Sequence, residues 1–104
     1  MSEPELSLDE AKAVIASTTA PRVTEESIRA KIADVRYLRE EVMTVCFIVM
    51  RNGFVFVGTS APASPENYDP EVGKRYAYDN AFKQIWPHEG YLLRELLSGP
   101  RESF

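Results

Sequence analysis

VMTVCFIVMRNGFVFVGT, residues 42–59, is the stretch of the chain that decides the fold. Its first part, residues 42–50, and its last part, residues 54–59, are rich in β-branched and aromatic residues, which is typical of strands. Asn52-Gly53 lies between them. An Asn-Gly pair between two apolar runs predicts a β-hairpin in which both turn residues adopt positive φ. We therefore expect two antiparallel strands joined by a tight turn.

The return strand of this hairpin is apolar on both of its faces. Successive side chains of a strand point to opposite faces, so Phe54 and Phe56 share one face. Val55 and Val57 share the other. Neither set is typical of a surface in contact with water, and we expect the sheet to be covered on both sides.

A third strand precedes the hairpin. Val35 and Tyr37, continued by Arg39, alternate with Arg36 and Leu38. Alternation of this kind is typical of a half-buried strand. With the hairpin, it predicts a three-stranded antiparallel meander.

Two short helices are expected before the sheet. Ser7-Leu8-Asp9-Glu10 has the pattern of a capping box and predicts a helix at about residues 8–17. Thr24 is the expected start of a second helix that runs to about residue 33. Two isoleucines of this helix should face the core, Ile28 and Ile32.

Two helices are expected after the sheet. Asp69-Pro70 is typical of a helix start, with Asp as the N-cap and Pro at the first helical position. This helix should run to about residue 85 or 86, because Pro87 disfavours helical geometry at the residue before it. A last helix, at about residues 88–97, should bury four leucines: Leu92, Leu93, Leu96 and Leu97.

These elements predict a single α+β domain over residues 1–104. It has two short N-terminal helices, a three-stranded antiparallel meander and two C-terminal helices packed on the sheet. Residues 1–6 and 99–104 are expected to be frayed tails. The 104 residues are 44% hydrophobic and 27% charged, which is typical of a globular domain. No apolar run approaches the roughly 20 residues of a membrane helix, so we expect no membrane partner.

Charge and cysteine content narrow the classes of partner. The net charge is −4, and binding to double-stranded nucleic acid depends on a basic surface, so we expect no double-stranded nucleic acid partner. The acidic N-terminus lacks the apolar segment of a signal peptide. The single Cys46 cannot form an internal disulfide, which favours a reducing compartment.

The residues that usually carry catalysis are scarce. The chain has one histidine and one cysteine, and neither pattern nor spacing predicts a metal site or a nucleophilic dyad. Cys46 lies in an expected strand and should be a small core residue. His88 follows Pro87 and is interpreted as a capping or surface residue. We therefore expect a binding protein without a cofactor rather than an enzyme.

The expected helix over residues 73–86, GKRYAYDNAFKQIW, is apolar on nearly every side. At 100° per residue, one face is formed by Ala77, Tyr78, Ala81, Phe82 and Ile85. This face should pack on the core. The opposite side holds charged residues but also three large apolar ones, Val72, Tyr76 and Trp86. Three interpretations remain open: cover by the last helix, a subunit interface, or a ligand site.

The ligand interpretation rests on three neighbouring side chains. Tyr76 could stack on a nucleotide base, Asn80 could read the edge of that base, and Lys83 could neutralise a phosphate. Arginines elsewhere would complete a phosphate pocket if they converged near Asn80: Arg22, Arg29, Arg51 and Arg94. The predicted ligand-binding residues are Tyr76, Asn80, Lys83, Arg94, Arg22 and Arg29.

An ordered series of short motifs runs through most of the chain. The series is Arg22-Val23-Thr24, Thr44, Cys46, Asn52-Gly53-Phe54, Gly58-Thr59-Ser60-Ala61, Asn67-Tyr68-Asp69, Gly73-Lys74, Ala77-Tyr78, Trp86 and Glu89-Gly90-Tyr91. It resembles the small bacteriophage protein family named for gene 49 of coliphage N-four and gene 66 of phage Sf-six, over about residues 8–97. The resemblance implies a phage accessory protein acting in the host bacterial cytoplasm, and it implies no particular activity.

The expected architecture is also similar to that of phage anti-defence sponges, which sequester cyclic nucleotide signals of the Thoeris and CBASS immune systems. The leading hypothesis is therefore a non-enzymatic homo-oligomer that binds a small nucleotide signal at a subunit boundary. The signal would be a cyclic ADP-ribose isomer or a cyclic oligonucleotide. The alternatives are an inhibitor that binds a host protein through the Tyr76 face, and a structural accessory protein without a ligand.

Overall fold

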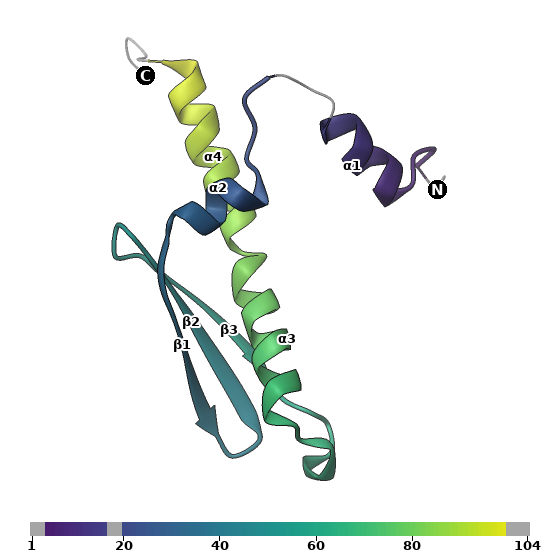
Figure 1. The fold of residues 1–104 in the computed structure, drawn as a ribbon, viewed down its shortest axis with the longest axis vertical. Coiled ribbons are helices and arrows are strands. Elements are labelled where there is room, and N and C mark those ends of the chain that lie inside the picture. Colours follow the sequence, from purple (N-terminus) through teal and green to yellow (C-terminus); the bar gives the residue numbers. More distant parts are fainter. Residues whose placement is uncertain (1–3, 17–19, 100–104) are drawn as a thin grey trace, which may run out of the picture.

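The computed structural model describes residues 4–16 and 20–99, and it confirms the α+β class (Figure 1). The predicted tails fall largely outside these residues, at 1–3 and 100–104. In chain order the elements are α1 (Leu8–Ala16), α2 (Glu25–Ala30), β1 (Ile32–Glu40), β2 (Met43–Met50), β3 (Val55–Ser60), a 3₁₀ turn (Pro65–Asn67), α3 (Pro70–Phe82) and α4 (Ile85–Ser98). Among the described residues, no helix combines the length and the apolar character needed to cross a bilayer.

The sheet has the predicted antiparallel order β1-β2-β3. Its register places Tyr37 opposite Cys46, and Cys46 opposite Gly58. The hairpin between β2 and β3 is confirmed, but the predicted turn geometry is wrong. Positive φ occurs at Gly53 (90°) and not at Asn52.

The hairpin loop has three residues rather than two. The Gly53 amide donates to the Met50 carbonyl over 2.9 Å, and the Met50 amide donates to the Phe54 carbonyl over 2.8 Å. In such loops only the last residue needs the left-handed conformation. The Asn52 side chain closes the turn instead, because its Oδ1 accepts from the Phe54 amide at 2.9 Å.

Only one face of the sheet is covered, so the expected two-sided cover is wrong. α3 lies along that face (Figure 1), where the buried residues of β2 and β3 are Thr44, Cys46, Ile48, Met50, Phe56 and Gly58. The other face keeps apolar side chains exposed, among them Leu38, Val55 and Val57. No helix of the described chain lies on that second side.

The helix α3 packs on the sheet through its predicted face. Ala77 and Ala81 are fully buried, Phe82 is 8% exposed, and Tyr78 packs at the edge of the core. Ile85, the last residue of the predicted face, is also fully buried, but it is the first residue of α4. Asp69 caps the helix as predicted, accepting at Oδ1 from the amides of Glu71 and Val72. The helix axis lies so near β3 that a Cβ atom on Gly58 would overlap the backbone of Ala77 and Ala81.

The break between the last two helices lies earlier than expected. α3 ends at Phe82 and α4 begins at Ile85, so Pro87 stands inside the first turn of α4 instead of ending α3. A proline ring clashes with the carbonyl four residues before it, here that of Lys83, and the chain breaks at that residue. Within the first turn of α4 the missing proline N–H costs no helical hydrogen bond.

The predicted burial of the α4 leucines is wrong. α4 continues beyond the end of the sheet (Figure 1), where α2 is the element that packs beside it. Leu92, Leu96 and Leu97 are therefore exposed, and Leu93 is half-buried. For the same reason the last helix does not cover the second side of α3, where Tyr76 remains 60% exposed.

Both N-terminal helices occur. α1 has the expected start, and the end expected at about residue 17 lies outside the described residues, whereas the end of α2 is corrected. The capping box that begins α1 is confirmed, since the Glu10 amide donates to Ser7 Oγ over 3.1 Å. α2 ends at Ala30 rather than near residue 33, because the carbonyl of Lys31 accepts from the Arg51 amide of the hairpin (2.8 Å). Ile28 is buried as predicted, whereas Ile32 contacts the core from β1 instead of from a helix.

Cys46 is a buried core residue, as expected. Burial raises the pKa of its thiol, and a hydrogen bond with the Tyr37 side chain acts in the opposite direction. Both effects belong to packing between β1 and β2. The thiol is therefore held as a neutral, buried group in the middle of the sheet.

Thr44 gives a first prediction about stability. Its side chain is 3% exposed, and its Oγ1 has no hydrogen-bond partner among the described residues. Valine has the same shape without the hydroxyl, so Thr44→Val should raise the free energy of unfolding by about 1–2 kcal/mol. Urea denaturation measures this, with Thr59→Val on the exposed face of β3 as a control near zero. A loss of stability in Thr44→Val would show that the hydroxyl is satisfied.

Candidate functional site

A cavity of about 420 Å³ lies between the β2–β3 hairpin and the first turns of α4. We call it the hairpin pocket. It is lined by Lys31, Met50, Asn52, Phe54, Phe56, His88, Glu89 and Leu92. Its volume is within the range of roughly 300–1,000 Å³ that is usual for small-molecule sites. The lining is mainly apolar with a few polar groups at the edge, which is also usual for such sites.

Aromatic rings form one wall of the hairpin pocket. Phe56 lies between Phe54 and His88, with both ring centroids 5.0 Å away and nearly edge-to-face angles of 62° and 83°. Phe56 is buried and belongs to the core, whereas Phe54 is 54% exposed. An exposed ring held by a buried one offers a stable surface on which a flat ligand ring can stack.

Two polar side chains of the pocket are oriented by the backbone. His88 Nδ1 lies 2.9 Å from the carbonyl oxygen of Gln84. Since a carbonyl only accepts, Nδ1 must carry a proton, and Nε2 remains for a second partner. Asn52 uses its oxygen to accept from Phe54, so its amide N–H groups are the donors at this edge.

An ion pair between Lys31 and Glu89 borders the pocket on the side of α2. The Glu89 side chain is 15% exposed and that of Lys31 is 47% exposed. Lys31, Glu89 and Leu92 also line a second hollow, of about 160 Å³, together with Arg22 and the α4 leucines. The two hollows therefore adjoin. Lys31 lines both of them, and Arg22 lines the second.

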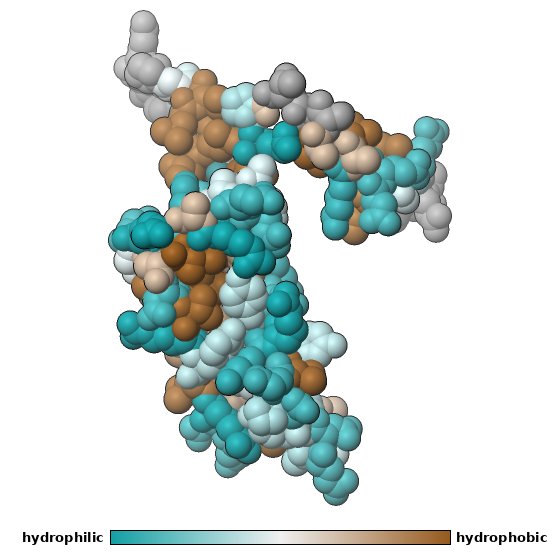
Figure 2. Space-filling view, in the orientation of Figure 1, coloured by the Kyte–Doolittle hydropathy of each residue, from teal (hydrophilic) through white to brown (hydrophobic). Residues whose placement is uncertain are grey.

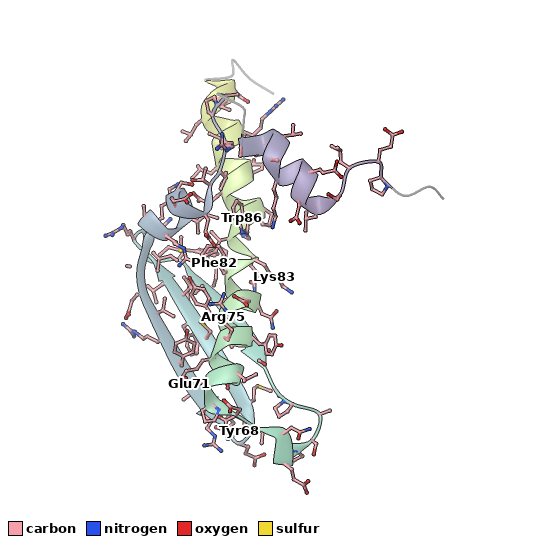
Figure 3. The ribbon with its side chains drawn as sticks, turned by 45° about the vertical axis from the view of Figure 1, so that its right-hand side comes forward. Tyr68, Glu71, Arg75, Phe82, Lys83 and Trp86 are labelled. Carbon is pink, nitrogen blue, oxygen red and sulfur yellow. The ribbon has the colours of Figure 1, made fainter. Side chains whose placement is uncertain are left out.

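The structure places Tyr76 and Asn80 in different roles. Tyr76 is exposed and lines a shallow hollow with Tyr68 and the loop that follows β3. The Asn80 amide donates to the carbonyl of Thr59 over 2.8 Å, which ties α3 to β3. Lys83 follows α3 and extends away from the sheet, on the side opposite Phe82 (Figure 3).

The three predicted arginines lie apart from this group. Arg29 pairs with Glu25 at 3.3 Å, and its guanidinium lies 5.4 Å from the centroid of the Phe82 ring. Arg94 is exposed on the outer part of α4, and Arg22 lies at the hollow beside the hairpin pocket. Within one chain the six residues do not converge. Their role in ligand binding stays a prediction, and it requires a second subunit.

The sequence did contain signals for the hairpin pocket, although they were interpreted otherwise. Asn52-Gly53-Phe54 was interpreted as a turn and His88 as a capping or surface residue. Both statements hold locally, since Asn52 closes the loop and His88 bonds to the preceding turn. What the pattern did not show is that α4 places His88 against Phe56, 32 residues away in the chain (88 − 56).

The lining of the hairpin pocket is suited to binding. Its described lining residues carry apolar, aromatic, amide, imidazole and charged side chains. Across residues 4–16 and 20–99, no three side chains of the His, Cys, Asp and Glu types lie close enough together to hold a metal ion. The groups present can stack, donate hydrogen bonds and attract negative charge.

Comparison with known proteins identifies the family. The model of the Phage protein (N4 Gp49/phage Sf6 gene 66) family matches residues 23–97, which is more than half of the chain. This match confirms the resemblance carried by the ordered motifs. No curated protein and no solved structure matches the chain. The chain therefore belongs to the phage protein family named for N4 Gp49 and phage Sf6 gene 66.

Proposed function

We propose that this phage protein acts without catalysis, by capturing a small nucleotide signal of bacterial immunity in the cytoplasm of the infected cell. The observation that supports the proposal is the composition of the hairpin pocket. It combines an exposed aromatic ring, an amide and a cation, which are the three groups needed to hold a nucleotide.

Each part of a nucleotide has a counterpart in the pocket. The base stacks on Phe54, and the Asn52 amide donates to an acceptor on the edge of the base. Lys31 and Arg22 lie toward the adjoining hollow and attract the phosphates. Glu89 partly neutralises Lys31. The proposed ligand is a cyclic ADP-ribose isomer or a cyclic oligonucleotide.

Capture alone can counter a signalling system. A protein that binds a signal tightly and in stoichiometric amounts lowers its free concentration without changing it chemically. This requires no nucleophile, metal ion or cofactor, and the aromatic, amide and cationic groups of the hairpin pocket support such a role. The proposed role of the protein is therefore that of a counter-defence sponge.

Isothermal titration tests the proposal. The protein is titrated with cyclic ADP-ribose isomers and with cyclic di- and trinucleotides. One member of the set should bind with a stoichiometry near one per chain or one per pair of chains. Absence of heat with every member, from a protein shown to be folded by circular dichroism, would sink the proposal.

Two matched variants locate the site. Phe54→Ala and Tyr76→Ala each remove one exposed aromatic ring, since these side chains are 54% and 60% exposed. Phe54→Ala should weaken binding by about tenfold or more, because base stacking contributes roughly 1–3 kcal/mol. Tyr76→Ala should bind like the wild type. The reverse result would assign the ligand to the Tyr76 face.

A second candidate function has a specific observation in its favour. Apolar surface covers the outer part of α4 (Figure 2), where Leu92, Leu96 and Leu97 are exposed. An exposed apolar helix is a usual way to bind another protein. If the protein inhibits a host protein, a pull-down from bacterial lysate should recover one defined partner that the Leu96→Lys variant no longer binds. Titration of the protein with nucleotides should then give no heat.

A further inference from the structure

The imidazole ring of His88 is held in one tautomer by the helix that carries it. Its Nδ1 lies 2.9 Å from the carbonyl oxygen of Gln84, four residues earlier in the chain. A carbonyl oxygen only accepts, so Nδ1 carries the proton. In the neutral ring Nε2 then keeps a free lone pair and acts as a hydrogen-bond acceptor. Among the described residues, Nε2 has no hydrogen-bond partner.

Packing fixes the plane of the same ring. The His88 ring meets Phe56 edge to face, with centroids 5.0 Å apart and planes at 83°. Its centroid is 5.9 Å from that of Phe54, the ring on which a base is proposed to stack. Phe56 is buried, so this contact cannot shift without opening the core. The acceptor therefore belongs to a ring that is ordered before a ligand binds, which lowers the entropic cost of binding.

Asn52 supplies the complementary group in the same pocket. Its Oδ1 accepts from the Phe54 amide over 2.9 Å, so its side-chain N–H groups are the donors. His88, Asn52 and Phe54 all line the hairpin pocket. A base stacked on Phe54 thus shares the pocket with one oriented acceptor and one oriented pair of donors.

This pair of groups suits a base that carries an amine beside a ring nitrogen. Adenine presents its 6-amino group as a donor next to the ring acceptor N7. Guanine and hypoxanthine carry an oxygen at the same position, which would place an acceptor against the lone pair of His88 Nε2. Every ADP-ribose isomer contains adenine, so adenine is already the base of one of the two ligand classes proposed above.

We propose, on the basis of the nucleotide function above, that His88 selects adenine as the base of the captured signal. Nε2 accepts from the 6-amino group, while the Asn52 amide donates to a ring nitrogen of the same base. A 6-oxo base is rejected because two acceptors would face each other with no proton between them. Groups left unpaired in this way are a strong source of discrimination between ligands.

Nitrogen NMR of the free protein tests the tautomer without any ligand. The chain has one histidine, so labelling with ¹⁵N-histidine gives the ring signals of His88 alone. At slightly alkaline pH, Nδ1 should have the shift of a protonated, pyrrole-type nitrogen, and Nε2 that of an unprotonated, pyridine-type nitrogen. Free histidine favours the opposite arrangement. A proton on Nε2 would overturn the role of His88 and leave the nucleotide function itself intact.

Matched ligands test the selection by isothermal titration. Cyclic di-AMP is compared with cyclic di-IMP, and cyclic ADP-ribose with cyclic inosine diphosphate ribose, so that each pair exchanges the 6-amino group for an oxygen. The adenine member should bind at least about tenfold more tightly. His88→Phe keeps a ring against Phe56 and should remove this preference. Asn52→Asp keeps the acceptor that closes the turn but loses the donors, so it should weaken both members and retain the preference.

Equal affinity of the wild type for both members of a pair would overturn selection by His88 alone. A preference that persists in His88→Phe, with the fold intact by circular dichroism, would do the same. Absence of heat with all four compounds would overturn the selection of adenine, and the wider set of nucleotides named above would then decide the proposed function separately.

Discussion

Gly58→Ala is expected to destabilise the protein by about 3 kcal/mol or more, and to leave little folded protein at 37 °C. The added Cβ would overlap the carbonyl oxygen of Ala77 and the backbone nitrogen of Ala81. Both are backbone atoms, so no side chain can rotate away, and α3 must move off β3 as a unit. That movement would open the core around Ile48 and Cys46. Urea denaturation followed by circular dichroism measures the loss.

Gly90 provides the matched control. It lies within α4, and a Cβ added there would meet no atom within 4 Å. Gly90→Ala should therefore raise the free energy of unfolding, since alanine is favoured over glycine in a helix by about 1 kcal/mol. The same substitution thus has opposite signs at the two positions. Equal stability of Gly58→Ala and the wild type would mean that α3 does not approach β3 as described.

Phe82→Ala is expected to cost about 3–5 kcal/mol. The ring is 8% exposed and packs between Tyr78 and Trp86, with centroid distances of 5.6 and 6.4 Å. Truncation would leave a cavity between α3, α2 and the sheet, which the two buried alanines of α3 are too small to fill. Thermal and urea unfolding both measure the loss.

Tyr76→Ala is the control for the other side of the same helix. Tyr76 is 60% exposed, so its truncation should change the free energy of unfolding by less than about 0.5 kcal/mol. The pair of variants tests the assignment of faces that was made from the sequence. Comparable losses from both would contradict the assignment of one core face and one exposed face to α3.

Local patterns predicted most of the fold because local chemistry decides those features. The Asp69 cap, the Ser7 capping box and the core face of α3 each depend on residues within a few turns of one another. The hairpin also followed from its own residues. Its turn type did not, because the Asn52 side chain closes the loop and removes the need for positive φ at that residue.

The cover of the sheet could not be predicted from the same patterns. The valines of β3 have the pattern of a buried face whether the cover comes from this chain or from another one. The leucines of α4 have the pattern of a core helix for the same reason, although α4 extends past the sheet. An apolar pattern predicts burial, and it does not show whether another element covers the surface.

The candidate site depended on distant contacts in the same way. The six residues predicted from the helix wheel and the arginine pattern lie in separate places. The hairpin pocket combines Lys31, which directly follows α2, with residues of the β2–β3 hairpin and of α4. An aromatic ring, an amide and a cation were the groups expected of a nucleotide site. The fold brings such groups together at Phe54, Asn52 and Lys31 rather than at the residues predicted from the sequence.

Analysis of the small molecules that the protein retains tests the central claim most directly. The wild type and Phe54→Ala are purified from bacteria that are producing a cyclic nucleotide immune signal, then denatured, and the released compounds are identified by mass spectrometry. The hairpin pocket predicts one nucleotide per chain or per pair of chains from the wild type and much less from Phe54→Ala. A wild type that releases no nucleotide, or a variant that releases the same amount, would contradict the account.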